Sequence, residues 1–248
     1  MKAFLPFIFS LITLGLLEWF VAVPSLFIWL SIAVIAISLF AALWINPEKK
    51  GWWKFAMLPI TANLITGTYL TIVGDNYLLY AIIVILTIVN FIYWRFVFLY
   101  LSKSPRYTSF SLENLSFYVN FVLVFLLGSV AYGFRAFLNL NPFLLFLIVL
   151  IILSLIIYQG FWVGKFSWRK SWLYWAIAWM ILLQIFAVLM FLPLDYNVLG
   201  LIWAANYYLV ISLVNDRLSD KFNISKLKFY IILTAIIWLL MLWTARWI

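Results

Sequence analysis

The sequence predicts an all-α fold, a polytopic transmembrane helical bundle, from three observations. Of the 248 residues, 69% are hydrophobic and only 9% are charged, which is typical of a membrane protein rather than a soluble domain. Apolar runs of about 20 residues, long enough to cross a hydrocarbon core of roughly 30 Å as helices, recur along the chain. Most basic residues lie in the short breaks between these runs. We therefore expect a single integral membrane domain over residues 1–248, without a soluble domain and with the lipid bilayer as its main partner.

Nine apolar runs are candidate spans. In order, they cover residues 4–17, 25–45, 55–73, 77–100, 115–134, 142–162, 172–192, 198–214 and 229–247. The first run is short, because Glu18 and Pro24 interrupt it, so it is either a short spanning helix or an interfacial segment. The prediction is thus about nine spans, or eight if the first is interfacial. We expect this first run to be an uncleaved helix, since no small-residue cleavage site follows it.

The charges of the breaks alternate along the chain. The even breaks and their flanks hold almost all of the basic residues, and only Arg135 and Arg246 belong to the other side. This is the positive-inside pattern of short loops, and it predicts a multi-pass protein of the plasma membrane with a cytoplasmic N-terminus and an outside C-terminus. A missed or invented span would reverse the sign of every later break, so the alternation supports the helix count. It also explains the net charge of +9 without a nucleic-acid partner.

Two similar turns suggest a weak parallel internal repeat at an offset of 120 residues. Residues 192–200 read LPLDYNVLG, and 120 positions earlier the chain reads TIVGDNYLL, so Asp75 matches Asp195. A shift of four helices preserves orientation, as in transporters whose halves are parallel repeats. Tight outside turns that need polar residues would also look alike without any duplication. Both interpretations remain open at this point.

Four amide side chains fall at mid-depth of predicted spans and form the candidate intramembrane polar site. They are Asn63, Asn90, Gln184 and Asn206, in the third, fourth, seventh and eighth spans. Polar groups in hydrocarbon are costly and are default functional candidates, and the near-symmetry of these four would suit a polar site between two halves. The alternative is that each amide bonds a neighbouring helix, a contact worth only about 0.6 kcal/mol on average.

The composition excludes several chemistries. The chain has no cysteine and no histidine, so disulfides, thiol nucleophiles, haem ligation by histidine, Ser-His proteolysis and HExxH zinc sites are excluded. No carboxylate or lysine lies at mid-membrane depth, which argues against a proton-driven pump and a retinal Schiff base. We expect no catalytic residue and no cofactor.

The one pair of closely spaced carboxylates is Asp216 and Asp220, in the stretch NDRLSDK. If the eighth helix continued through both, they would share a face and could hold Mg²⁺ against a lipid diphosphate. The basic residues around them also fit an ordinary solvated helix end. The sequence therefore favours a non-enzymatic transporter, permease-like protein or subunit that assembles with other membrane proteins. The alternative is an intramembrane Mg²⁺-dependent enzyme that acts on a lipid at the cytoplasmic face.

Overall fold

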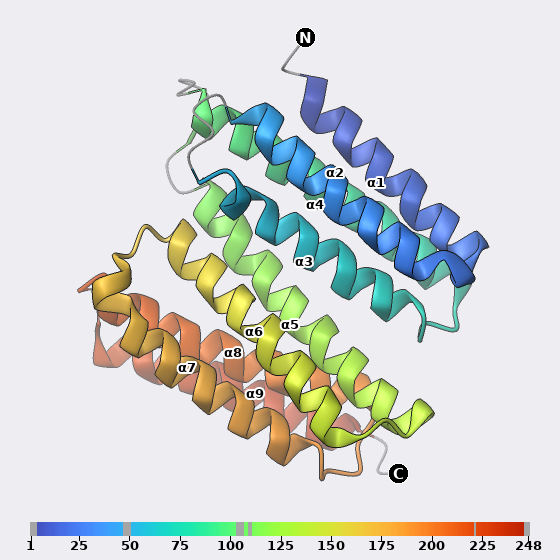
Figure 1. Cartoon of the computed structure of the whole chain (residues 1–248). Coiled ribbons are helices and arrows are strands. Elements are labelled where there is room, and N and C mark those ends of the chain that lie inside the picture. The colour runs from blue at the N-terminus through green and yellow to red at the C-terminus, as the bar shows by residue number, and fades with distance from the viewer. Residues whose placement is uncertain (1–3, 47–50, 103–106, 109–110, 221, 246–248) are drawn as a thin grey trace. The chain divides into compact units, whose positions relative to one another are not determined.

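The computed structural model describes residues 4–46, 51–102, 107–108, 111–220 and 222–245, and over these residues the fold is all-helical (Figure 1). The helices are α1 (Leu5–Ala22), α2 (Phe27–Ile45), α3 (Trp53–Leu70), α4 (Asn76–Leu101), α5 (Ser111–Leu138), α6 (Pro142–Val163), α7 (Trp168–Leu189), α8 (Tyr196–Leu218) and α9 (Ile224–Thr244). One 3-10 turn, η2 (Pro24–Leu26), precedes α2. These helices confirm the fold class that the sequence predicts.

Eight of these helices are long and apolar enough to cross a membrane, and the multi-pass architecture follows from them. The first predicted span is among the eight, because α1 continues past Glu18 to Ala22 and reaches 18 residues. The helix that falls short is α3, which contains Pro59, Asn63 and several threonines. Most of its residues are nevertheless buried against neighbouring helices. A helix enclosed by protein needs less apolar surface than one that faces lipid, so α3 can be more polar than its neighbours.

The matching aspartates of the two similar turns are helix N-caps. Asp75 precedes α4, and its Oδ1 accepts a hydrogen bond from the backbone N–H of Tyr77 at 2.8 Å. Asp195 precedes α8, and its Oδ1 accepts from the backbone N–H of Asn197 at the same distance. A carboxylate at this position satisfies an amide that the helix itself leaves unpaired and also interacts favourably with the helix dipole. The likeness of the two turns therefore has a local structural cause.

The chain divides into two compact units, residues 1–119 and 120–248, with the boundary inside α5. In the first unit α1 packs against α2 and α4, and α3 packs against α2 and α4. The helices thus form a ring in which each has two main neighbours. The buried aromatic side chains of Phe9 and Trp94 lie where α1 meets α4.

The second unit repeats this neighbour order and adds one helix. α6 packs against α7, and α7 against α8. α5 contacts α6 through Asn120 and contacts α8 at Gly128. The pairs α5–α8 and α6–α7 thus correspond to α1–α4 and α2–α3, four helices earlier. α9 packs on α8, and Thr234 is its single buried residue within the described part. The matching order supports the predicted parallel repeat at the level of topology.

Aromatic side chains donate hydrogen bonds to backbone carbonyls of neighbouring helices in both units. The indoles of Trp175 and Trp179 on α7 donate to α6 carbonyls at 3.4 and 3.1 Å, and Trp203 on α8 donates to the Leu182 carbonyl of α7 at 2.9 Å. The Tyr132 hydroxyl on α5 donates to the Phe186 carbonyl of α7 at 3.1 Å. Such bonds satisfy indole and phenol donors that lipid tails cannot pair, so they fix which helices are neighbours.

Candidate functional site

The best-defined polar cluster of the first unit surrounds Pro59 in the middle of α3. Proline has no N–H, so the carbonyl of Phe55, one turn earlier, loses its partner within the helix. The hydroxyl of Tyr93 on α4 donates to that carbonyl at 2.8 Å and replaces the missing bond. Tyr93 and Pro59 are both buried. The tyrosine therefore compensates for the proline, and the sequence analysis did not identify it because the two residues lie on different helices.

Two of the four predicted amides meet next to this cluster. Asn90 on α4 donates from Nδ2 to Oδ1 of Asn63 on α3 at 3.0 Å, and both residues are buried. Asn63 in turn donates from Nδ2 to the carbonyl of Pro59 at 2.7 Å. The chain of bonds runs from one helix to the backbone of the other, which is how an amide pair holds two membrane helices together.

A small cavity adjoins Asn63 within the first unit. It is lined mainly by apolar residues of α1 and α2, with Ser31, Asn63 and Gly67 among its other walls. Its volume is about 20 Å³, which is room for roughly one water molecule. The hydroxyl of Ser31 and the amide of Asn63 are the polar groups that such a molecule would meet.

The other two predicted amides, in the second unit, are not bonded to each other. Asn206, half-buried on α8, donates from Nδ2 to the carbonyl of Ile202 in its own helix at 2.8 Å. Gln184 is exposed on α7, and its amide makes no hydrogen bond within the described part of the chain. The near-symmetry of the four amides in the sequence therefore corresponds to one bonded pair in the first unit, without a counterpart pair between α7 and α8.

The second unit has a different amide pair, which the sequence analysis missed. Asn120 on α5 donates from Nδ2 to Oε1 of Gln159 on α6 at 2.8 Å, and both side chains are about 1% exposed. The hydroxyl of Tyr207 lies beside the same amide. Oδ1 of Asn120 is buried and accepts no hydrogen bond from the described residues. The position of Asn120 could have indicated a buried amide, because it lies nine residues after the start of α5, roughly 14 Å along the helix axis.

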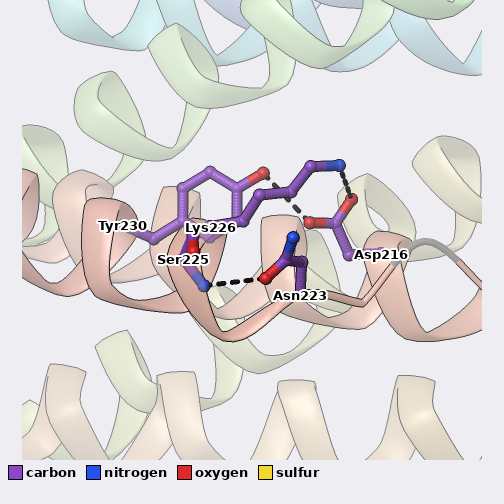
Figure 2. Close-up of polar contacts among 5 residues, drawn as sticks. All are labelled: Asp216, Asn223, Ser225, Lys226 and Tyr230. Carbon is purple, nitrogen blue, oxygen red and sulfur yellow. Dashed lines mark hydrogen bonds and ion pairs between the residues drawn. The ribbon is translucent and has the colours of Figure 1, made fainter.

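The predicted carboxylate pair lies at the junction of α8 and α9, and Figure 2 shows how Asp216 is held there. Its Oδ1 lies 3.5 Å from the ammonium of Lys226, and its Oδ2 accepts a hydrogen bond from the hydroxyl of Tyr230 at 3.2 Å. Asn223 caps the start of α9 by accepting from the N–H of Ser225 at 2.9 Å. Both carboxylate oxygens of Asp216 are thus used to attach α9 to α8.

Asp220 does not lie on the same helix face as Asp216. α8 ends at Leu218, and Asp220 follows in a left-handed conformation with φ of 54°. The Mg²⁺ alternative was based on a helix that continues through both residues, and the structure does not have that helix. No group of three or more carboxylates that could hold a metal occurs among the described residues. The metal assignment stays a prediction without support from this geometry.

Arg135, the one described basic residue that the charge pattern leaves on the outside, has a structural partner. It lies near the end of α5, and its Nη1 donates to the carbonyl of Met190 at 2.7 Å. Met190 is the C-cap residue of α7, and the guanidinium also lies 5.8 Å from the ring of Phe191. A cation beside unpaired carbonyls at a helix C-terminus is stabilising. This contact accounts for an arginine on the side that otherwise has few basic residues.

Comparison with protein-family models, with curated proteins and with solved structures gives no match.

Proposed function

We propose that the chain is a non-enzymatic subunit of a membrane complex, in which buried polar groups hold helices together. The bonded pair of Asn63 and Asn90 carries this proposal, because its donors are used within the fold, on the other amide and on the Pro59 carbonyl. The pair of Asn120 and Gln159 supports it in the second unit. The sequence-based orientation belongs to the same proposal, with a cytoplasmic N-terminus, an outside C-terminus and the plasma membrane as location.

The complex is tested by isolating the tagged chain from its native membranes in a mild detergent. The expected result is a stable assembly clearly larger than the 29.1 kDa chain, with its components identified by mass spectrometry. A chain that is isolated alone at every detergent concentration would contradict the proposal. The orientation is tested separately by a reporter enzyme inserted after Lys165, where we expect a cytoplasmic location.

A permease for a very small neutral solute is the second candidate, and the cavity beside Ser31 and Asn63 favours it. Its test is the swelling rate of vesicles that contain the purified chain, in gradients of urea or glycerol. A permease predicts faster swelling than in empty vesicles and loss of the increase in Asn63→Leu. Asn206→Leu is the matched control, because the amide of Asn206 donates to the Ile202 carbonyl of its own helix, α8. The subunit proposal predicts the same swelling rate for all vesicles.

The lipid-enzyme alternative predicts Mg²⁺-dependent turnover of a lipid diphosphate by the purified chain. The variant Asp216→Asn, Asp220→Asn should then lose this turnover. Because Lys226 and Tyr230 already contact both carboxylate oxygens of Asp216, we expect no turnover by the natural protein or by the variant.

A further inference from the structure

The amide of Gln184 is a hydrogen-bonding group on the outer surface of a membrane helix. α7 faces α6 through the indoles of Trp175 and Trp179 and faces α8 at the Leu182 carbonyl. Gln184 is exposed on the remaining side, five residues before the helix ends, or roughly 8 Å along its axis. Among the described residues, neither its N–H₂ nor its carbonyl has a partner. Within the described residues, the fold therefore leaves the Gln184 amide unpaired.

Lipid tails cannot satisfy that amide. An unpaired amide in an apolar medium costs on the order of 1–3 kcal/mol by protein measurements and more on hydrocarbon scales. The side chains around it on the same face are large, apolar and exposed, and they follow the spacing of three to four residues of one helix face. They are Leu173, Ile177, Met180 and Val188. An apolar stripe with a polar residue within it is the pattern of a helix–helix contact in membranes.

We propose that this face of α7 pairs with α7 of a second copy of the chain, with the two Gln184 amides bonded to each other. An amide carries a donor and an acceptor, so it is complementary to itself across a two-fold axis. Copies that share one orientation in the membrane place Gln184 at the same depth without further adjustment. An unrelated partner would need its own polar residue at that depth. The inference rests on the proposed function, because it names the partner within the complex.

The charges of α7 are compatible with this pairing. Arg169 and Lys170 are exposed at the start of the helix, and like charges from two copies would repel. They lie 14 or 15 residues from Gln184, roughly 21 Å along the axis. Helices that cross near Gln184 at an angle of about 20–40° diverge toward those ends. The basic residues are then separated by more than a screening length of about 8 Å.

The absence of natural cysteine allows a direct test by disulfide cross-linking in membranes. Met180→Cys and Val188→Cys, whose native side chains are 55% and 64% exposed, flank Gln184 on the proposed contact. Leu239→Cys is the matched control, since Leu239 is 68% exposed and also lies five residues before the end of its helix, α9. We expect oxidation to give covalent dimers of the α7 variants and little or none of the control. Equal cross-linking at all three positions would overturn the proposal.

The role of the amide is tested with Gln184→Leu and Gln184→Asn in the Met180→Cys background. Leucine on a lipid-facing surface should not impair folding, and unchanged tryptophan fluorescence checks this. We expect Gln184→Leu to weaken dimer formation by about three- to thirtyfold, as a loss of interhelical amide bonds implies. Gln184→Asn should retain part of the dimer. A chain that is monomeric but bound to a different protein would overturn this inference and leave the proposed function standing, whereas a solitary monomer would overturn both.

Discussion

In the second unit, α5 and α8 approach each other closely at Gly128 and Gly200. Where α5 crosses α8, a Cβ on Gly200 would lie 2.8 Å from both the Phe125 carbonyl oxygen and the Ser129 backbone nitrogen. Both atoms belong to the α5 backbone and cannot rotate away as a side-chain end could. Gly128 on α5 lies opposite, where a Cβ would meet Gly200 and Trp203. Gly200→Ala therefore requires the two helices to separate.

The magnitude follows from three contributions. Overpacking a closely packed contact costs typically about 1–3 kcal/mol. Helix separation also strains the bond from the Trp203 indole to the Leu182 carbonyl, which is worth about 0.5–1.5 kcal/mol. The higher helix propensity of alanine offsets about 1 kcal/mol of this destabilisation. The expected net loss in the free energy of unfolding is about 0.5–3.5 kcal/mol.

The assay is denaturant unfolding in detergent, followed by the fluorescence of the 15 tryptophans. Gly15→Ala is the matched control, because Gly15 lies within α1 and a Cβ there would meet nothing within 4 Å. The control should be as stable as the natural protein or slightly more stable. If Gly200→Ala were as stable as Gly15→Ala, the close contact between α5 and α8 would be refuted.

Two further predictions concern the other clusters. Tyr93→Phe should destabilise the protein by about 1–3 kcal/mol because the Phe55 carbonyl loses its donor, and the loss should largely vanish in a Pro59→Ala background, where the backbone N–H is restored; equal losses in both backgrounds, measured by unfolding, would contradict this role. Asp216→Asn should weaken the attachment of α9 by at most about 1 kcal/mol, since Lys226 is 47% exposed, and the difference from the natural protein should shrink at high salt. If the difference in the free energy of unfolding did not change with ionic strength, the ion pair would not be its cause.

The sequence was sufficient to predict the helices, because periodic apolar runs and charged breaks mark spans directly. It also identified Asp75 and Asp195 as similar, and their common role as N-caps is local. The polar contacts were harder to predict. Asn63 and Asn90 were recognised as candidates, but their bond depends on the packing of α3 against α4.

The sequence also misplaced the depth of two amides, Asn120 and Gln159, because depth depends on where the helices begin and how they pack. Asn120 was passed over because the predicted fifth span begins at residue 115, while α5 begins at Ser111 and extends the helix by one turn. Gln159 lies near the end of α6 and looks like an interfacial residue until α5 is packed beside it. Residue identity indicates that an amide needs a partner, but only the three-dimensional packing shows which partner it has.

The repair of Pro59 by Tyr93 constrains how the chain enters the membrane. α3 is not among the eight helices that are apolar enough to span a membrane, and a hydrogen bond from Tyr93 of α4 replaces the one that Pro59 removes. Alone in lipid, α3 would expose the Phe55 carbonyl and Oδ1 of Asn63 without hydrogen-bond donors. Together with α4 it forms a hairpin in which both groups are paired. We therefore expect α3 and α4 to enter the lipid together during synthesis, with α3 held beside the insertion machinery until α4 has been synthesised.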